Sequence, residues 1–593
     1  MARARTIALV SAGVLLLASS SSIATAEYGV TYESNVPVKM RDGVTLRADI
    51  YRPNANGKFP VLLQRTPYNK DGDVGFGLKA AARGYVVIIQ DVRGRYASEG
   101  EWYTFKHESN DGYDTVEWAA ALPSSDGRVG MFGGSYVGAT QMLAAIARPP
   151  HLAGICPFVT GSNYHSNWTY QGGAFQQWFN ESWTSGLAQN AFNRDVSNRT
   201  NATKGIWQLP LGSYRLFNDL ADGGVPVSIK SHAPYFLDWL AHPSEDAYWK
   251  QWSIEAHFSE ITVPQLTIAA WYDIFQDGSL RNYVGVKAHG ATDAARRGQR
   301  LLVAVGGHAG DGPKIGDVDF GSDSRFDYEA ATLAWYDHLF KGAQNEFGGK
   351  RVKIFVMGAN QWREEDDWPL VRAQATKYFL HSTGKANSVR GTGTLSTESP
   401  GASEPSDQYV YDPANPAPTI GGPLCCDAAH MPPGPRDQRQ VEAREDVLVY
   451  STTPLASDME VTGPVSLELY VKSSAVDTDF TAKLVDVWPD GFAQNLTDGI
   501  LRTRYRNSQE KPALMTPGQI YKLTIDVWST SNVFKKGHAL RLEVSSSNFP
   551  RFNRNLNTGD DNGTGQRFVP ATNTVLHDAQ HPSALTLPVV RLP

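Results

Sequence analysis

The chain has little cysteine, no surplus of positive charge and no long apolar run beyond its first residues. Only 3 of its 593 residues are cysteine, which excludes a small fold held together by disulfide bonds. The formal net charge of −6 excludes the basic surface that nucleic-acid binding requires. No stretch after the N-terminal segment approaches the roughly 18 apolar residues of a membrane span. We therefore expect a soluble globular protein with about two to four domains.

The sequence also lacks a recognisable metal-binding motif. Cys156, Cys425 and Cys426 lack the spacing of a zinc site, and no His-Glu-x-x-His motif occurs. Residues 560–563 resemble part of a calcium loop but lack its later ligands. We expect no metal and no cofactor.

The cysteines themselves suggest no disulfide framework. A bond between the neighbours Cys425 and Cys426 would close a strained small ring, so two free or mixed thiols in a loop are the simpler expectation, although the sequence does not decide their redox state. Cys156 follows an apolar run and is expected to be a small buried side chain.

The first 26 residues have the layout of an export signal. Arg3 and Arg5 are followed by an apolar stretch over residues 7–18, and residues 24–26 read Ala-Thr-Ala, a small-residue cleavage site. The apolar stretch is too short to span a bilayer. We expect cleavage after Ala26 and a secreted or periplasmic protein. A retained membrane anchor is the alternative interpretation.

Residues 129–138 carry the most informative motif, Val-Gly-Met-Phe-Gly-Gly-Ser-Tyr-Val-Gly. An apolar run, a serine between glycines and a helix-forming stretch make a nucleophile elbow, a tight turn that exposes the hydroxyl of Ser135. The second glycine, Gly138, comes one residue later than in the usual G-x-S-x-G pattern, with Val137 in its place. The strand before the serine and the helix after it favour a nucleophile over an ordinary turn.

Strands and helices alternate on both sides of Ser135, which predicts a parallel sheet with helical crossovers. Reactive side chains gather at the carboxyl ends of such strands, and in sheet hydrolases the acid and then the base follow the serine. One apolar run ends in Asp273, and another leads through two glycines to His308. We therefore predict Ser135 as nucleophile, His308 as general base and Asp273 as the acid that orients it.

Each of these residues has an alternative. Asp273 could be no more than the N-cap of the helix that follows it, and His308 could be a loop histidine without a partner. Asp277 is the rival carboxylate, but it lies a turn into that helix. His338 is the rival histidine, although its surroundings are those of a helix.

The tetrahedral intermediate of such an enzyme carries an oxyanion that needs hydrogen-bond donors. The backbone N–H of Tyr136 begins the helix after the serine, where the helix dipole also favours negative charge. A second donor is expected in the loop after the first parallel strand, which contains Tyr68. The phenol of Tyr68 is a competent donor, and a merely packed ring is the alternative.

Between residues 161 and 252 the strand pattern vanishes and aromatic residues become frequent, which predicts a helical cap inserted into the sheet domain. Its aromatic side chains either bind an apolar acyl group or form the core of the cap. The candidates for substrate contact are Trp168, Trp178, Phe179 and, after the cap, Phe275; the same aromatic-rich stretch includes Trp183 and Trp207.

The C-terminal part reads as short strands with period two, which predicts an antiparallel sandwich. A strand at 353–357 is expected to be among its first. The predicted organisation is therefore a signal peptide (1–26), a sheet domain in two parts (27–160 and 253–345), the cap (161–252) and an all-β domain (346–593).

Taken together, these motifs resemble the serine hydrolase family that includes cocaine esterase, X-prolyl dipeptidyl-peptidases, α-amino-acid ester hydrolases and glutaryl-type cephalosporin acylases. The matching stretches are Met40-Arg41-Asp42-Gly43, Arg65-Thr66-Pro67-Tyr68, Gln90-Asp91-Val92-Arg93-Gly94, Gly134-Ser135-Tyr136, Trp271-Tyr272-Asp273, Gly307-His308, Asp437-Gln438-Arg439 and Ser545-Ser546-Ser547-Asn548-Phe549-Pro550. The resemblance implies an α/β-hydrolase domain with an inserted helical cap and a C-terminal jelly-roll sandwich. It also implies the same roles for Ser135, Asp273, His308, Tyr68 and Tyr136, and the late glycine is the form that this family uses.

The sequence departs from the family pattern in two places. Gly306 and Gly307 precede the histidine where members have a proline and an aromatic residue, so we expect a more mobile loop. Members that act on α-amino esters carry acidic residues after the aspartate, but here Ile274, Phe275 and Gln276 follow. A buried ammonium without a counter-charge is costly, so we expect a neutral or apolar acyl group.

We conclude from the sequence that this is a secreted serine hydrolase cleaving a small-molecule ester or amide through an acyl-Ser135 intermediate, with no nucleic-acid or membrane partner. An X-prolyl dipeptidyl-peptidase or a cephalosporin-type acylase is the alternative within the class. The non-enzymatic alternative is a jelly-roll binding protein with a vestigial hydrolase domain. The oligomeric state cannot be predicted.

Overall fold

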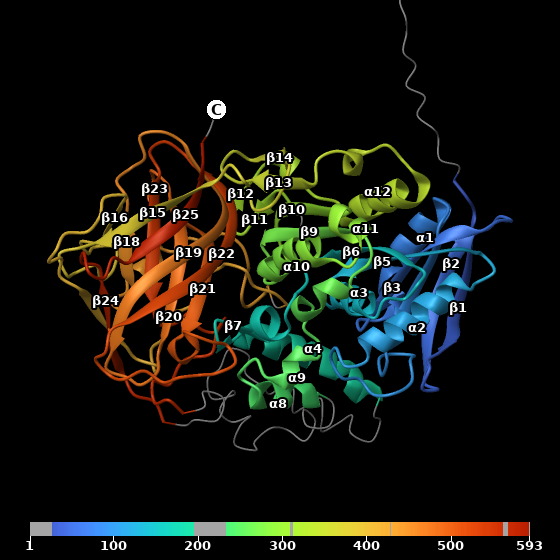
Figure 1. Cartoon of the computed structure of the whole chain (residues 1–593), viewed down its shortest axis with the longest axis horizontal. Coiled ribbons are helices and arrows are strands. Elements are labelled where there is room, and N and C mark those ends of the chain that lie inside the picture. The colour runs from blue at the N-terminus through green and yellow to red at the C-terminus, as the bar shows by residue number, and fades with distance from the viewer. Residues whose placement is uncertain (1–26, 195–232, 309–311, 427, 561–566, 592–593) are drawn as a thin grey trace, which may run out of the picture.

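The computed structural model describes residues 27–194, 233–308, 312–426, 428–560 and 567–591. Figure 1 shows two bodies side by side, one with helices around its sheet (blue to yellow-green) and one almost entirely of strands (yellow to red). In this part of the chain no helix is both long and apolar enough to cross a membrane.

The first body is built on a sheet of ten strands, counted over the described residues. In hydrogen-bonded order they are β1 (Val30–Lys39), β2 (Thr45–Pro53), β4 (Val86–Asp91), β3 (Phe59–Thr66), β5 (Ser125–Gly134), β6 (Leu152–Phe158), β9 (Gln265–Tyr272), β10 (Gln299–Gly307), β13 (Val352–Val356) and β14 (Gln361–Glu365). All pairs from β4 to β13 are parallel. These strands are buried on both faces, which explains why they read as continuous apolar runs.

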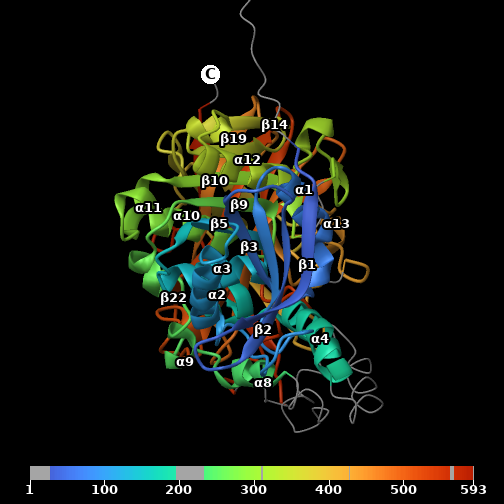
Figure 2. The ribbon, with the colours of Figure 1, turned by 90° about the vertical axis from the view of Figure 1, so that its right-hand side faces the viewer.

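Helices cover both faces of this sheet. Val86 of β4 belongs to one apolar core and its neighbour Val87 to another, because successive side chains of a strand point to opposite faces. Figure 2 views the sheet from the β1 side, with two of the covering helices, α2 and α3, to the left of β3. The first core is covered by α2 (Glu108–Ala120), α3 (Tyr136–Ile146) and α10 (Gln276–His289), and the second by α1 (Val74–Ala82) and α12 (Tyr328–Lys341).

Between β6 and β9 the chain leaves the sheet and forms the cap. Figure 1 shows three of its helices, α4, α8 and α9, grouped below the junction of the two bodies. Trp207, with the rest of 195–232, lies outside the described residues. The described elements are η2 (a π helix, His165–Thr169), β7 (Tyr170–Gln171), β8 (Ala174–Phe175), α4 (Gln177–Arg194), α8 (Pro234–Ala241), α9 (Ala247–Lys250) and η4 (Glu255–Glu260).

The second body is one hydrogen-bonded system of eleven strands within the described residues, folded into a sandwich. In order these are β17 (Asp407–Tyr411), β24 (Ala571–Leu576), β19 (Met459–Ser473), β25 (Ala584–Val590), β15 (Gln374–His381), β16 (Thr394–Ser396), β18 (Leu448–Ser451), β23 (Ala539–Ser545), β20 (Asp479–Val487) and β21 (Ala493–Arg502), with β22 (Tyr521–Phe534) beside β19. Val465, Leu467 and Leu469 of β19 are buried, and Ser466 and Glu468 between them are partly exposed. The predicted period of two therefore holds in this strand.

Short elements complete both bodies. They are η1 (Lys70–Asp73), α11 (Asp293–Arg297), the hairpin β11 (Lys314–Ile315) and β12 (Val318–Asp319), η5 (Ser322–Ser324), η6 (Glu346–Gly348), α13 (Arg439–Glu442) and η7 (Thr503–Tyr505).

One strand prediction is wrong. The strand expected at 353–357, in the all-β domain, is β13, and it pairs in parallel with β10 and so extends the first sheet. A short apolar strand looks the same in either sheet, so its sequence could not place it. Otherwise the architecture confirms the predicted fold class, an α/β-hydrolase domain with a helical cap and a C-terminal jelly-roll sandwich.

Candidate active site

Ser135 lies on the sharp turn between β5 and α3. Its φ of 60° and ψ of −128° belong to a region that residues with side chains seldom occupy. The two glycines before it allow the turn to close, because a Cβ on Gly133 would lie 2.3 Å from Val137 Cγ1 and one on Gly134 would lie 2.4 Å from the Phe158 ring. The strained turn lifts the hydroxyl above the carboxyl ends of the parallel strands, as a nucleophile elbow does.

The late glycine of the motif has a packing reason. A Cβ on Gly138 would lie 2.8 Å from Cβ of Thr160, a residue that follows β6. The hydroxyl of Thr160 in turn donates to the backbone oxygen of Ser135 at 2.8 Å. Gly138 is therefore required for close approach of α3 to the segment after β6, and this approach fixes the serine turn.

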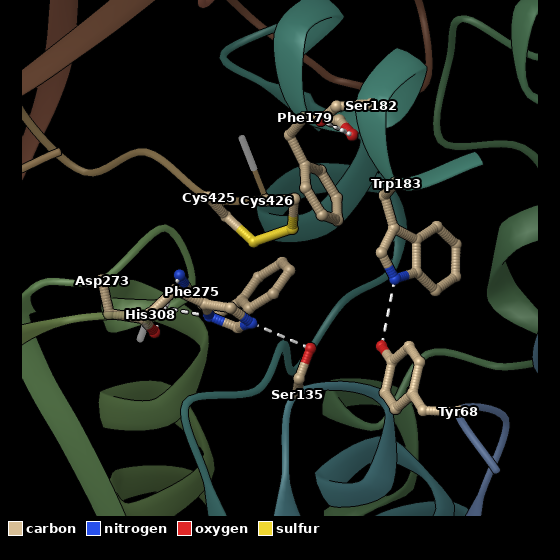
Figure 3. The surroundings of a disulfide bond; sticks show 10 residues. All are labelled: Tyr68, Ser135, Phe179, Ser182, Trp183, Asp273, Phe275, His308, Cys425 and Cys426. Atoms are coloured by element: carbon tan, nitrogen blue, oxygen red, sulfur yellow. Dashed lines mark hydrogen bonds and ion pairs between the residues drawn. A yellow bond between two sulfur atoms is a disulfide. The ribbon is translucent and has the colours of Figure 1, made fainter. Parts of the chain in front are cut away.

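Asp273 and His308 come from the ends of β9 and β10 and reach Ser135. The distance from His308 Nε2 to Ser135 Oγ is 3.0 Å, and that from His308 Nδ1 to Asp273 Oδ1 is 2.7 Å (Figure 3). Asp273 is fully buried, and its second oxygen accepts a hydrogen bond from the Phe275 backbone at 3.0 Å. With both carboxylate oxygens occupied, Asp273 holds the imidazole with Nε2 directed at the serine.

The two rivals lie elsewhere. Asp277 accepts a hydrogen bond from Arg281 at 2.6 Å, one turn further along α10. His338 lies on α12, and its Nδ1 is 3.0 Å from the backbone oxygen of Ala343. Neither arrangement involves Ser135.

The aspartate end of the site is joined to the jelly-roll. The Tyr272 hydroxyl donates to the backbone oxygen of Asn495 at 2.9 Å. The Gln276 amide donates to the Ser529 backbone oxygen at 2.7 Å and accepts from the Ser529 N–H at 3.2 Å. The residues on both sides of Asp273 are thus held by β21 and β22, so the second body stabilises the position of this carboxylate.

Tyr68 lies on the other side of the serine, in the loop after β3. Its hydroxyl accepts a hydrogen bond from Trp183 Nε1 at 3.0 Å (Figure 3). Although 39% of Tyr68 is exposed, desolvation raises the pKa of its phenol, and hydrogen bonds with the Ser135 side chain and the Tyr136 backbone act in the opposite direction. Because its pKa is raised, the phenol stays protonated at neutral pH. Its hydrogen bonds place it next to both the Ser135 side chain and the Tyr136 N–H.

The side chain of Tyr136 is anchored below the turn. Its hydroxyl donates to Glu108 at 3.1 Å and accepts from the Phe105 N–H at 2.7 Å. Glu108 in turn pairs with the buried Arg65 at 2.7 Å. These bonds hold the first residue of α3, so its backbone N–H is fixed beside the serine.

The loop that carries Tyr68 is also fixed from below. Asp91, at the end of β4, is fully buried and accepts hydrogen bonds from the backbone N–H groups of Lys70 at 2.8 Å and Ala97 at 3.2 Å. Burial raises the pKa of Asp91 to about 6, and these backbone bonds partly offset that rise.

Three of the four predicted substrate-contact residues lie together. Trp168 stacks on Phe275 with ring centroids 4.2 Å apart, and Phe179 meets both rings edge-on at 5.7 and 5.3 Å. Phe275 also packs edge-on against His308 at 5.2 Å. Trp178 does not join them. It is buried, its backbone N–H donates to the backbone oxygen of Pro550 in the jelly-roll, and no ring contact with the cluster is found among the described residues.

The sequence analysis did not predict two features of the site, Trp183 and a disulfide bond. Trp183 orients Tyr68, although its place in the aromatic-rich cap stretch was the only signal for it. Cys425 and Cys426 form a disulfide bond with each other beside the site (Figure 3), so the expectation of two free or mixed thiols is wrong. Cys156 is a free, buried cysteine, as predicted. No cluster suited to a metal ion is found among the described residues.

The fold and this arrangement define a serine hydrolase. Residues 42–310 match the family model described as X-Pro dipeptidyl-peptidase (S15 family), and residues 345–586 match that of the X-Pro dipeptidyl-peptidase C-terminal non-catalytic domain. The chain is 39% identical to the cocaine esterase of Rhodococcus sp. (strain MB1 Bresler) over 94% of this chain and 98% of the relative. The protein therefore belongs to the family of serine hydrolases that includes cocaine esterase.

Two solved structures have the same architecture. An aminopeptidase from a marine sediment Thaumarchaeota archaeon has a TM-score of 0.81 and 25% identity, covering 98% of this chain and 99% of that one. An α-amino-acid ester hydrolase has a TM-score of 0.77 and 23% identity, covering 97% and 100%. At this level of identity the second likeness shows the fold alone.

Proposed function

We propose that this serine hydrolase is an esterase that cleaves esters with a neutral, apolar acyl group through a covalent acyl-Ser135 intermediate. The observation that carries the proposal is the continuous hydrogen-bonded path from Ser135 through His308 to the buried Asp273. A serine hydroxyl needs a base to become a nucleophile, and this path supplies the base and its orienting acid.

The reaction follows from the geometry. Ser135 Oγ attacks the acyl carbon while His308 Nε2 takes its proton, and Asp273 stabilises the resulting imidazolium. The Tyr68 hydroxyl and the Tyr136 backbone N–H donate to the oxyanion. His308 then protonates the departing alcohol, and in the second half it activates the water that releases the acid and regenerates Ser135.

The preference for a neutral acyl group rests on the side chains around the site. Phe179, Phe275 and Trp168 form an apolar cluster beside His308, and the two residues after Asp273, Ile274 and Phe275, are buried and uncharged. An α-ammonium group placed against these side chains would lose its hydration without gaining a counter-charge from them. The name of the Rhodococcus relative also assigns an ester as its substrate.

The test compares methyl phenylacetate with the methyl ester of phenylglycine. The two substrates are of similar size and differ by the α-ammonium group. We expect a higher kcat/KM for the phenylacetate ester, and no turnover of either by Ser135→Ala. A clear preference for the phenylglycine ester would contradict the proposed acyl group. Failure of the wild-type protein to cleave any ester would contradict the esterase itself.

A second candidate is cleavage of a dipeptide from a peptide N-terminus, favoured by the family model and by the archaeal aminopeptidase of similar structure. It requires a carboxylate that faces the substrate ammonium. An aminoacyl-prolyl anilide tests it directly, and a kcat/KM above that of the esters would favour the peptidase. A cephalosporin-type acylase would instead cleave a side-chain amide of that antibiotic class.

We also propose that the mature protein begins after Ala26 and acts outside the cytoplasm. The export-signal layout of residues 1–26 supports this. The Cys425–Cys426 bond is in keeping with it, because thiols in the cytosol are kept reduced. N-terminal sequencing of the protein secreted by its native cells is the test.

A further inference from the structure

The Cys425–Cys426 disulfide lies at the edge of the active site and comes from the jelly-roll body. Figure 3 shows it on the Phe179, Phe275 and His308 side of the Ser135 hydroxyl, with Trp183 and Tyr68 on the other side. Cys425 is 6% exposed and belongs to the same apolar cluster as Phe179 and Phe275. Cys426 is exposed. The disulfide therefore joins a buried cysteine to an exposed one, and Phe179 and Phe275 are among the residues that surround it (Figure 3).

The loop that carries the disulfide is held in place at its base. The backbones of Gly422 and Gly434 exchange two hydrogen bonds of 2.8 and 2.9 Å, which close the loop. Just beyond this closure, the Arg436 N–H donates to the Asn495 side chain at 2.6 Å, and the Arg436 guanidinium pairs with Asp317 at 2.7 Å. Asn495 is in β21 and Asp317 in the β11–β12 turn, so the loop is fixed to both bodies of the molecule.

Joining the two sulfurs changes what this loop presents to the site. Two free thiols rotate independently and can donate hydrogen bonds, whereas a disulfide has no S–H donor and keeps its sulfurs together. Sulfur is polarizable and makes favourable contacts with aromatic rings. This surface therefore favours an apolar substrate group.

We propose that the Cys425–Cys426 disulfide is a wall of the acyl-binding site, against which an aryl or large apolar acyl group packs, and that it sets the preference for such groups over acetyl. The acyl side is assigned because the disulfide lies on the same side of Ser135 as Phe179 and Phe275, opposite Trp183 and Tyr68 (Figure 3). This proposal rests on the proposed esterase function and adds a determinant of its substrate class. The hydrogen-bonded path from Ser135 through His308 to Asp273 does not include the disulfide, so we assign the disulfide a role in selectivity.

The experiment measures kcat/KM for p-nitrophenyl phenylacetate and p-nitrophenyl acetate, which share a leaving group. In the double variant Cys425→Ala/Cys426→Ala we expect the phenylacetate-to-acetate ratio to fall about tenfold, which corresponds to about 1.4 kcal/mol. Acetate hydrolysis should stay within about threefold of wild type. The matched control is Cys156→Ala, which removes the buried cysteine of β6 and should keep the wild-type ratio.

An unchanged ratio in an active double variant would overturn the proposal while leaving the esterase intact. A changed preference among alcohol groups, with the acyl ratio unchanged, would overturn the assignment to the acyl side. If the wild-type protein cleaves neither ester, the proposed function fails first, so the two failures can be told apart.

A second measurement needs no change at the two cysteines. In the Cys156→Ala protein, a water-soluble phosphine reduces the disulfide: with one water molecule it yields two thiols and the phosphine oxide. We expect no alkylation by iodoacetamide under denaturing conditions before reduction, alkylation of both Cys425 and Cys426 after it, and a fall of the ester ratio to that of the double variant. Alkylation before reduction, or an unchanged ratio after it, would overturn the proposal.

Discussion

Replacing Tyr68 by phenylalanine tests the oxyanion site most sharply. The hydroxyl of Tyr68 accepts from Trp183 at 3.0 Å and interacts with Ser135 and the Tyr136 N–H. Because Trp183 donates a hydrogen bond to the phenol oxygen, the O–H of the phenol is available to donate to the substrate oxygen. Phenylalanine keeps the ring and removes only this donor.

The expected loss in kcat is about 100- to 1,000-fold, the usual effect of removing one oxyanion donor and about 2.7–4 kcal/mol of transition-state stabilisation. KM should change little, since the neutral carbonyl of the ground state is a weaker acceptor than the oxyanion. The assay is steady-state hydrolysis of p-nitrophenyl acetate by purified protein. A loss smaller than about threefold would refute the role of Tyr68.

A matched control removes a phenol hydroxyl elsewhere. Tyr51 is buried in the core on the α1 face of the sheet, away from Ser135. Tyr51→Phe should therefore keep kcat within about twofold of wild type. An equal loss in both variants would point to a general effect of removing buried hydroxyls.

Three further predictions concern the supports of the site. Trp183→Phe should lower kcat about 3- to 10-fold, because the Tyr68 phenol loses one hydrogen bond worth about 0.5–1.5 kcal/mol. An unchanged kcat would contradict the role of Trp183 in positioning Tyr68. Gly138→Ala should destabilise the fold by about 1–3 kcal/mol, because the new Cβ would lie 2.8 Å from that of Thr160; an unchanged urea midpoint would refute this packing. Burial raises the pKa of Asp91 from 3.8 to about 6, so its contribution to stability is full below pH 3.8 and is lost as pH rises through 6. Relative to Asp91→Asn, the wild-type free energy of unfolding should therefore fall by about 3 kcal/mol between these two pH values. A difference between the two proteins that stays constant with pH would contradict this prediction.

The sequence was informative where a local pattern has one physical meaning. A serine between glycines after an apolar run is such a pattern, and the strand ends that lead to Asp273 and His308 are others, because parallel strands bring their carboxyl ends to one edge of the sheet. The structure places His308 within hydrogen-bonding distance of both Ser135 and Asp273.

The features that the sequence did not reveal depend on contacts between distant segments. Trp183 and Tyr68 meet only because the cap helix α4 packs over the loop after β3, and nothing in either segment encodes that contact. The adjacent cysteines gave no signal of their proximity to Ser135, because the loop that carries them belongs to the other body. Trp178 and Phe179 looked alike as aromatic neighbours, yet consecutive helical residues face different directions.

Labelling by a fluorophosphonate tests the central claim most directly, because this reagent reacts with a serine only when a base and an oxyanion site activate it. We predict a single covalent adduct, located by peptide mass spectrometry on Ser135, that is absent in Ser135→Ala and forms at least about 100-fold more slowly in His308→Ala. An unlabelled wild-type protein, or an adduct on another residue, would contradict the account.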